Sequence, residues 1–253
     1  MSTTLEVLFA PAEYAVLPNR DLTDTVCVVF DILRATTTMM TALANGAQEI
    51  LPVSEIEEAL AIRKHRPDVL LAGERHGLRI LADQTGGRDF DFGNSPREFT
   101  PEAVAGKTIV MTTTNGTRAL RACALSKTVL IGTFLGVQAV AGWIARERPS
   151  NLLLVCSGTV DQGSYEDTLG VGALCDLIWS DYAGGSISDS AQIARQIYSA
   201  ARCDLFQAMQ FARNGRRLLA LPDLRDDVRY CVHRDTLAFV AGLFRDGAVR
   251  KLS

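Results

Sequence analysis

Short apolar runs alternate with helix-like segments along most of the chain. We predict strands at residues 5–9, 26–30, 49–53, 69–72, 108–111, 129–131 and 152–155. The runs at 26–30 and 152–155 are apolar on both faces, which is typical of strands that helices cover on both sides. Strands that alternate with helices in this way predict an α/β protein folded as a three-layer α/β/α sandwich.

Capping signals indicate where some of the helices begin. A capping box that starts at Ser54 predicts a helix ending near Lys64. Thr100 followed by Pro101 is typical of a helix cap and a proline in the first helical position.

The last third of the chain has a different pattern. Residues 190–213 predict one long helix, with Gly215 just beyond its end. Asp246-Gly247 predicts a hairpin turn between two short strands. Because no low-complexity linker is present, we expect a single α/β domain over 1–253, with a C-terminal embellishment at about 180–253.

The first two-thirds of the chain contains a weak internal repeat. The strand at 26–30 leads into Thr36-Thr37-Thr38 and a helix, and the strand at 108–111 leads into residues 112–117 and another helix. An internal duplication would explain this weak repeat, and so would the ordinary succession of βαβ units, which share this layout.

Composition and charge narrow the class of protein. The chain is 47% hydrophobic with a net charge of −3, which suits a soluble enzyme and does not predict a basic nucleic-acid-binding surface. Its six cysteines form no C-x-x-C pair and do not cluster with the three histidines, which argues against a zinc or redox site. With no secretory signal and no run of 18 apolar residues, we expect a cytoplasmic protein that does not contact membranes. The sequence is compatible with a homo-oligomer.

Four polar clusters follow predicted strands. Ligands of open α/β sheets bind beyond the carboxyl ends of the strands, where helix N-termini favour anions. Carboxylates there suit a divalent metal, while hydroxyl, N–H and guanidinium groups suit phosphate. Each cluster alone also fits a helix cap, such as Ser164 with Asp167, or a tight turn. The clusters comprise residues 31–38, Glu74 with residues 91–96, residues 112–117, and residues 156–158 with 164–169.

A competing motif is Arg75-His76-Gly77, which matches the short signature of histidine phosphatases. Such an enzyme needs a second histidine, for which only His65 and His233 remain. A three-residue match is common by chance, so we treat this mechanism as an alternative.

Four motifs in one order give the chain a resemblance to a known family. They are residues 31–38, 93–96 and 113–117, and Glu166-Asp167. This combination resembles the 2-phosphosulfolactate phosphatase family of coenzyme M biosynthesis, most clearly from about Val26 to Leu174. The resemblance implies Mg²⁺-dependent hydrolysis of 2-phosphosulfolactate or a related 2-hydroxy acid phosphate, a small-molecule substrate. It also implies a mixed, largely parallel sheet.

With this resemblance, the clusters give a set of expected roles. We expect Asp31, Arg34 and Asp167 to be catalytic, with Asp31 or Asp167 orienting water. The expected Mg²⁺ ligands are Asp31, Glu74, Glu166 and Asp167. Expected substrate-binding residues are Thr36, Thr37, Thr38, Asn94, Ser95, Thr113, Thr114, Asn115, Gly116 and Thr117. Direct attack by water and a phosphoenzyme both remain open, as does a non-catalytic module that senses anionic 2-phospho acids.

Overall fold

One mixed sheet of eleven strands runs through the structure, a computed structural model that describes residues 3–252. The strand order is β5-β4-β6-β3-β11-β10-β7-β2-β8-β1-β9. All seven predicted strands are confirmed, and the largest shift is at β4, which continues to Arg75. The strands are β1 (Thr4–Leu8), β2 (Thr25–Phe30), β3 (Glu49–Val53), β4 (Leu70–Arg75), β5 (Leu78–Arg79), β6 (Thr108–Thr112), β7 (Thr128–Gly132), β8 (Asn151–Cys156), β9 (Ser186–Ile187), β10 (Ala241–Leu243) and β11 (Val249–Lys251).

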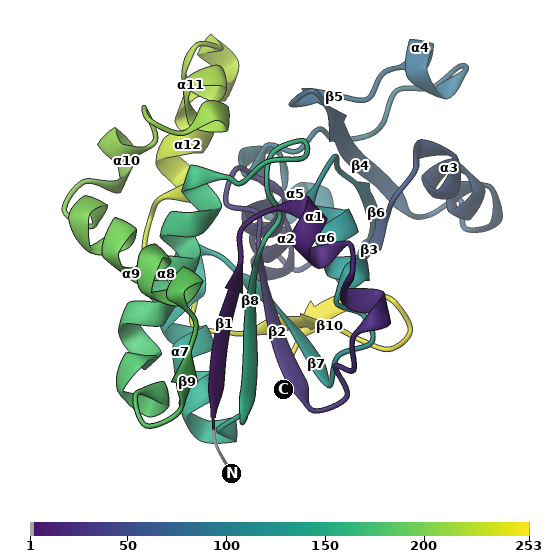
Figure 1. The fold of residues 1–253 in the computed structure, drawn as a ribbon. Helices are drawn as coiled ribbons and strands as arrows, with labels where there is room; N and C mark the ends of the chain where they lie inside the picture. The colour runs from purple at the N-terminus through teal and green to yellow at the C-terminus, as the bar shows by residue number, and fades with distance from the viewer. Residues whose placement is uncertain (1–2, 253) are drawn as a thin grey trace.

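Helices lie on both faces of this sheet, which confirms the three-layer α/β/α architecture (Figure 1). The helices of the described chain are α1 (Pro11–Tyr14), α2 (Ala35–Ala44), α3 (Ile56–His65), α4 (Ala82–Thr85), α5 (Pro101–Val104), α6 (Gly116–Ala122), α7 (Val137–Glu147), α8 (Tyr165–Tyr182), α9 (Asp189–Ala201), α10 (Leu205–Ala208), α11 (Arg213–Leu219) and α12 (Arg225–Cys231).

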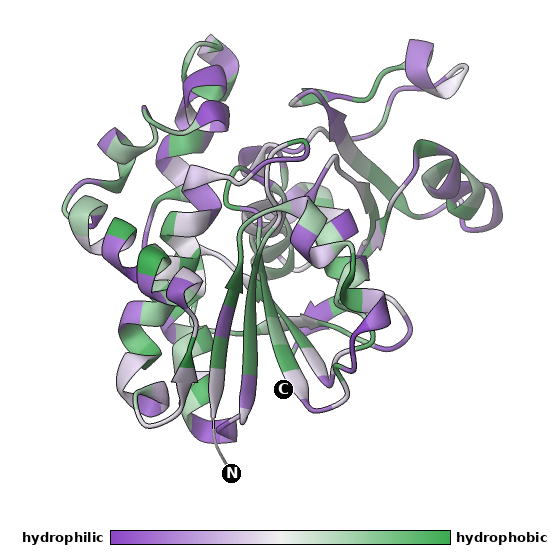
Figure 2. Cartoon of the chain, in the orientation of Figure 1, coloured by the Kyte–Doolittle hydropathy of each residue, from purple (hydrophilic) through white to green (hydrophobic). Residues whose placement is uncertain are grey.

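The central strands are buried on both faces because alternate side chains enter two different cores. On β2, Val26, Val28 and Phe30 pack in the cluster that includes residues of α7, α8 and α9. Cys27 and Val29 pack in the cluster that includes residues of α2 and α6. Figure 2 shows the apolar colouring of these strands between the more polar outer helices.

The sheet consists of two parallel halves joined by a hairpin. Strands β1, β8, β2 and β7 are mutually parallel, and so are β4, β6 and β3. The hairpin β10–β11 pairs antiparallel with β7 on one side and with β3 on the other. Its turn at Asp246-Gly247 is confirmed, with Gly247 at φ +84°. The extreme C-terminal strands therefore lie in the middle of the sheet.

The strand order is symmetrical about this hairpin. Counted outward from the hairpin, one half contains β3, β6 and β4, and the other contains β7, β2 and β8. The first repeat, β2 to β4, and the second, β6 to β8, have therefore exchanged their first strands, β2 and β6. Strand β3 pairs with β6, and β7 pairs with β2. An ordinary succession of βαβ units does not require such an exchange, so the topology favours duplication as the source of the weak repeat in the sequence.

The helix predicted over residues 190–213 is wrong as a single element. Helix α9 ends at Ala201, and α10 begins after Asp204, whose Oδ1 accepts a hydrogen bond from the Gln207 N–H at 2.9 Å. Gly215 does not follow a helix end but lies inside α11, where a Cβ would come within 2.1 Å of the Met209 carbonyl oxygen. Local capping and close packing therefore break the amphipathic pattern into three helices.

The two capping predictions differ in outcome. Helix α5 begins at Pro101 with Thr100 as its N-cap, as predicted. Helix α3 starts at Ile56 with Glu55 as its N-cap, one residue later than Ser54, and the Ser54 N–H donates to Glu58 instead.

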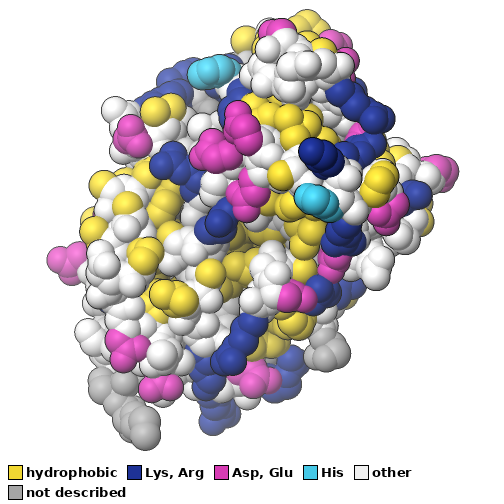
Figure 3. All heavy atoms as spheres, turned by 90° about the vertical axis from the view of Figure 1, so that its right-hand side faces the viewer, with side chains coloured by type: hydrophobic (Ala, Val, Ile, Leu, Met, Phe, Trp, Pro, Cys, Tyr) yellow, Lys and Arg dark blue, Asp and Glu magenta, His cyan; other side chains and the backbone are white. Residues whose placement is uncertain are grey.

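Helix hydrophobicity and surface charge both bear on the class of protein expected from the sequence. In the described part of the chain, no helix combines the length and apolar character that crossing a bilayer requires. Figure 3 views the molecule from the side of α3, β4 and β5, and basic and acidic side chains are interspersed on this face.

Candidate active site

A small cavity of about 70 Å³ lies where the loops after β2, β4, β6 and β8 converge. Loops from both halves of the sheet therefore contribute to one site. Eight of the residues expected to act in the site line this cavity. They are Asp31, Arg34, Glu74, Asn94, Thr114, Asn115, Glu166 and Asp167.

The two halves come close together at Gly116, the first residue of α6. A Cβ on Gly116 would lie 2.6 Å from Asp31 Oδ2 and 2.7 Å from the Ala35 Cβ. Only glycine leaves room for α6 and the N-terminus of α2 to meet here. Gly116, which we expected to bind substrate, thus permits the contact that forms the cavity.

Asp167 is held in place by three donors. Its Oδ1 accepts from the Ile32 N–H at 2.8 Å, and its Oδ2 accepts from Ser157 Oγ at 3.0 Å and from the Gly158 N–H at 3.1 Å. The Ser164 side chain caps α8 by accepting from the Asp167 N–H. Asp167 therefore combines the helix-capping arrangement with a fixed place in the cavity wall.

Glu74 is bonded in a similar way. Its Oε2 accepts from the Gly77 N–H at 2.6 Å. Its Oε1 accepts from both the backbone N–H and the hydroxyl of Thr114, at 2.9 and 2.8 Å. The carboxylate thereby links the β4–β5 turn to the loop after β6.

Two polar side chains of the cavity keep oxygens without hydrogen-bond partners. Both Oε atoms of Glu166 and Oδ1 of Asn94 are buried and bond to no atom of the described chain. Asp31 accepts from the Ala35 N–H through Oδ1, at 3.1 Å. Buried oxygens without partners are costly, so these atoms mark the place where a ligand would compensate them.

Burial destabilises the charged forms of the acidic groups. Burial, together with the neighbouring Glu74 and Glu166 carboxylates, raises the pKa of Asp31 to about 6. Burial also raises the pKa of Asp167 well above its usual range, reinforced by Asp31 and Glu166, and burial raises that of Glu166. The cavity is therefore a site of concentrated, poorly solvated negative charge.

Arg34 lies in the cavity wall, and its terminal nitrogens already have partners. Nη1 donates to Asp227 Oδ2 at 2.6 Å, and Nη2 donates to the Gly77 carbonyl at 2.7 Å. Asp227, on α12, also accepts from Ser95 Oγ at 2.7 Å and from Arg97 Nε at 2.9 Å. The structure therefore places Arg34, expected to be catalytic, and Ser95, expected to bind substrate, in a buried ion network.

The remaining threonines hold the loops rather than lining the cavity. Thr36, Thr37 and Thr38 donate to the carbonyls of Asp31, Ile32 and Asn94, at 2.9, 3.0 and 3.0 Å. In the second half of the sheet, Thr113 and Thr117 bond to each other around the start of α6. All five are buried, and none of them lines the cavity.

Comparison with known proteins identifies a matching family. A family model described as 2-phosphosulpholactate phosphatase matches residues 13–245. The chain belongs to this family.

Relatives in the family are similar over nearly their whole length. A probable 2-phosphosulfolactate phosphatase of Caldanaerobacter subterraneus subsp. tengcongensis is 38% identical over 241 residues, covering 94% of this chain and 95% of the relative. A protein of the same name from Caldicellulosiruptor saccharolyticus is 33% identical, covering 95% of this chain and 98% of the relative. A third, from Picosynechococcus, is 37% identical over 213 residues, covering 83% and 85%.

Sequence reasoning missed the part of this family member's site that comes from the C-terminal helices. Asn214, Arg217 and Leu218 of α11 line the cavity, and Asn214 Nδ2 donates to Thr159 Oγ1 at 3.0 Å. The only sequence signal is their spacing of three and four residues, which places them on one face of a helix.

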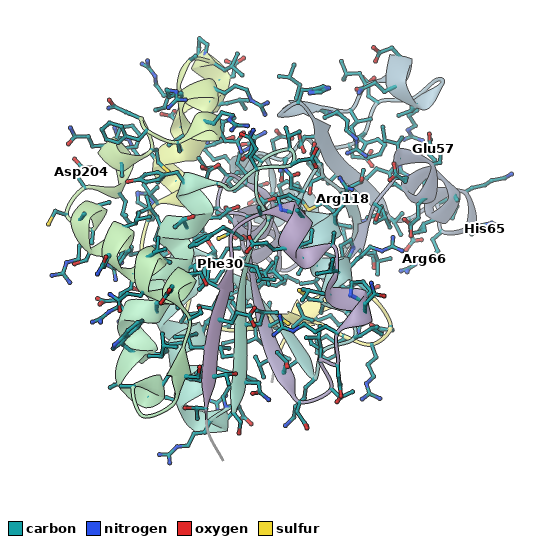
Figure 4. All side chains as sticks on the ribbon, viewed as in Figure 1. Phe30, Glu57, His65, Arg66, Arg118 and Asp204 are labelled. Atoms are coloured by element: carbon teal, nitrogen blue, oxygen red, sulfur yellow. The ribbon has the colours of Figure 1, made fainter. Side chains whose placement is uncertain are left out.

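The histidines do not form a pair in this site. His76 lines the cavity, whereas His65 lies on α3 at the outer edge of the molecule (Figure 4). His233 packs near the Tyr230 ring, with the ring centroids 6.1 Å apart. Among residues 3–252, His76 is thus the one histidine that lines the cavity.

The first prediction concerns the ion network. Asp227→Ala should lower the free energy of unfolding by about 3–5 kcal/mol, because it leaves the buried Arg34 guanidinium without its carboxylate. The adjacent Asp226→Ala is the control, since the exposed Asp226 side chain pairs only with Arg97 and should cost at most about 1 kcal/mol. Urea unfolding of both variants measures the difference, and equal losses would contradict it.

The second prediction concerns pH in metal-free protein. Between the ordinary pKa of an aspartate and about 6, folded Asp31 keeps a proton that the unfolded chain has lost. The free energy of unfolding should therefore fall as pH rises through this window, by about 3 kcal/mol for this group alone. Asp31→Asn should make the fall in unfolding free energy with pH less steep, whereas Asp24→Asn, at an exposed position, should not change it. An unchanged slope in Asp31→Asn would refute the assignment.

Proposed function

We propose that this chain is a Mg²⁺-dependent phosphatase that hydrolyses 2-phosphosulfolactate, or a related 2-hydroxy acid phosphate, to the 2-hydroxy acid and phosphate. The observation that carries the proposal is the cavity in which buried acids surround the unpartnered oxygens of Glu166 and Asn94. Family membership supports the substrate class. We propose further that the reaction belongs to the type used in coenzyme M biosynthesis and takes place in the cytoplasm.

The donor set fits Mg²⁺. This ion prefers oxygen ligands and commonly binds one or two carboxylates together with water and substrate phosphate. Among residues 3–252, no three His, Cys, Asp or Glu side chains form a ready metal cage. Asp31 Oδ2 and the Glu166 carboxylate would hold the ion, with Asn94 Oδ1 as a neutral donor beside them. Asp167 and Glu74, whose oxygens are already bonded, would orient this set.

Charge provides a second argument for a cation. A phosphate monoester carries up to two negative charges and would be repelled by the acids of the cavity. Burial raises the pKa values of Asp31, Asp167 and Glu166, and repulsion from Glu166 contributes to the shifts of Asp31 and Asp167. When bound, Mg²⁺ would neutralise this charge and the charge that develops on the phosphoryl group.

The chain's own groups would orient the reactants. Asp31 or Asp167 would orient an attacking water or accept its proton. A reaction through a phosphoenzyme would instead need an aspartate carboxylate of the site to attack phosphorus. Thr114 and Asn115, half-buried in the cavity wall, offer hydroxyl and amide donors to phosphoryl oxygens.

The third prediction tests the metal. Exhaustive chelation should abolish phosphate release from 2-phosphosulfolactate, and added Mg²⁺ should restore it. Glu166→Gln should lower kcat/KM by roughly a hundredfold or more, because it removes a charged ligand. The exposed Glu102→Gln is the matched control and should change little. Full activity of the chelated protein would falsify the proposal, and binding without phosphate release in Mg²⁺ would instead indicate a metabolite-binding module.

The fourth prediction separates this mechanism from that of a histidine phosphatase. His76→Ala should keep activity within about threefold, because no second histidine lines the cavity to complete that mechanism. A phosphohistidine enzyme would lose nearly all activity on the same change. Rapid quenching with labelled substrate provides a second measurement, and a label on His76 would assign the reaction to the histidine mechanism.

A further inference from the structure

A cation without an acidic partner lies at the rim of the acidic cavity. Arg217 lines the cavity from α11 and is exposed to solvent. Within residues 3–252 its guanidinium takes part in no ion pair or hydrogen bond. The nearby Arg34 differs, since its charge is matched by Asp227.

The surrounding residues position α11 and leave room for the Arg217 side chain. Leu218 is only 2% exposed and anchors α11 in the core, while Asn214 ties the same helix to Thr159. The Arg217 guanidinium packs against Gly77, where a Cβ would come within 2.3 Å of Nη2. Gly77, at φ +79°, has no side chain and so leaves space for the guanidinium beside the β4–β5 turn. Helix α11 therefore places the Arg217 charge at the rim of the cavity.

The chemistry of the substrate explains such a charge. The name 2-phosphosulfolactate describes a three-carbon acid with a carboxylate on the first carbon, a phosphate on the second and a sulfonate on the third. The phosphate belongs at the acidic floor, where Glu166 and Asn94 have unpartnered oxygens. Sulfur is one bond further from the phosphorylated carbon than the carboxyl carbon is, so the sulfonate reaches furthest toward the rim. A sulfonate presents paired oxygens that a planar guanidinium can bind with two parallel hydrogen bonds.

We infer that Arg217 determines substrate specificity by binding the sulfonate of 2-phosphosulfolactate while the phosphate lies among Asp31, Glu166 and Asn94. This inference rests on the proposed function for the identity of the ligand. It makes α11 a specificity element that the C-terminal segment places over the strand-end acids. Arg217 does not touch the reacting phosphorus, so its role is in recognition.

The test compares two substrates that differ in the sulfonate. Arg217→Ala should lower kcat/KM for 2-phosphosulfolactate roughly ten- to hundredfold, mainly through KM, because one charge-assisted contact is lost. For 2-phospholactate, which lacks the sulfonate, the change should stay within about threefold. Arg217→Lys should fall between, since lysine keeps the charge without the two-pronged geometry.

The adjacent arginine supplies the control. Arg216 donates to the Phe211 carbonyl at 2.8 Å and does not line this cavity, so Arg216→Ala should leave both substrates unaffected. Equal losses of Arg217→Ala on the two substrates would overturn the inference, because the residue would then bind a group that both share. Unchanged kinetics on both would overturn it as well.

Product binding tests the inference without turnover. Calorimetry should show that Arg217→Ala weakens the binding of 3-sulfolactate in the presence of Mg²⁺ and leaves that of lactate nearly unchanged. If the wild-type chain binds 3-sulfolactate in this way but hydrolyses neither phosphate ester, the proposed function fails and the inference stands. If Arg217→Ala binds 3-sulfolactate as tightly as the wild-type chain, the inference fails whether or not the chain is a phosphatase.

Discussion

Burial of several acids in one small cavity is the constraint on which the rest of this site depends. Burial raises the free-energy cost of ionising Asp31, Glu166 and Asp167, and repulsion from Glu166 adds to this cost for Asp31 and Asp167. The fold offsets part of this cost by directing N–H and O–H donors at Asp167 and Glu74. It leaves Glu166 without such donors. An arrangement of this kind is costly for the isolated chain and becomes favourable when a cation binds, as the proposed reaction requires.

The architecture of the sheet explains how these acids meet. The symmetrical halves contribute Asp31 from the end of β2 and Glu74 from the end of β4. The absence of a side chain at Gly116 lets the start of α6, which follows β6, approach Asp31 and the N-terminus of α2. The C-terminal segment contributes to the same cavity in two ways. Asp227 neutralises Arg34, a residue 193 positions away in the sequence, and α11 covers the rim. The integrity of the site therefore depends on tertiary contacts between the two ends of the chain.

The sequence revealed the strands and the acids but not the pairing of charges. Runs such as residues 152–155 must be buried on both faces, so their place in a covered sheet follows from composition alone. Strand ends likewise mark where ligands bind, which is why eight expected residues line the cavity. The same rule could not separate Thr114, in the cavity wall, from Thr113 and Thr117, which hold the helix start. All three are small polar residues near a helix N-terminus, and only packing distinguishes them.

The residues that sequence reasoning missed share a physical cause. Asp227 and Arg217 lie in a helical region where a charged residue on an amphipathic surface is ordinary, so no local pattern distinguishes a buried acid from a solvated one. The partition of Ser190 to Leu219 into three helices was missed for the same reason, since it depends on Asp204 as a cap and on Gly215 meeting Met209.

The two arginines at the cavity show how the site can accept a ligand with several negative charges. Arg34 is buried and its charge is already matched by Asp227, so it adds little net positive potential to the acidic floor. In the proposed reaction, attraction for the phosphate at the floor therefore comes from a bound cation. Arg217 is exposed and has no acidic partner in the described chain, so its charge remains available at the rim. In the proposed reaction, this separation would give the phosphate a binding site that depends on metal and the remote acid group one that does not. Affinity for the remote group can therefore change without altering the groups that act on phosphorus.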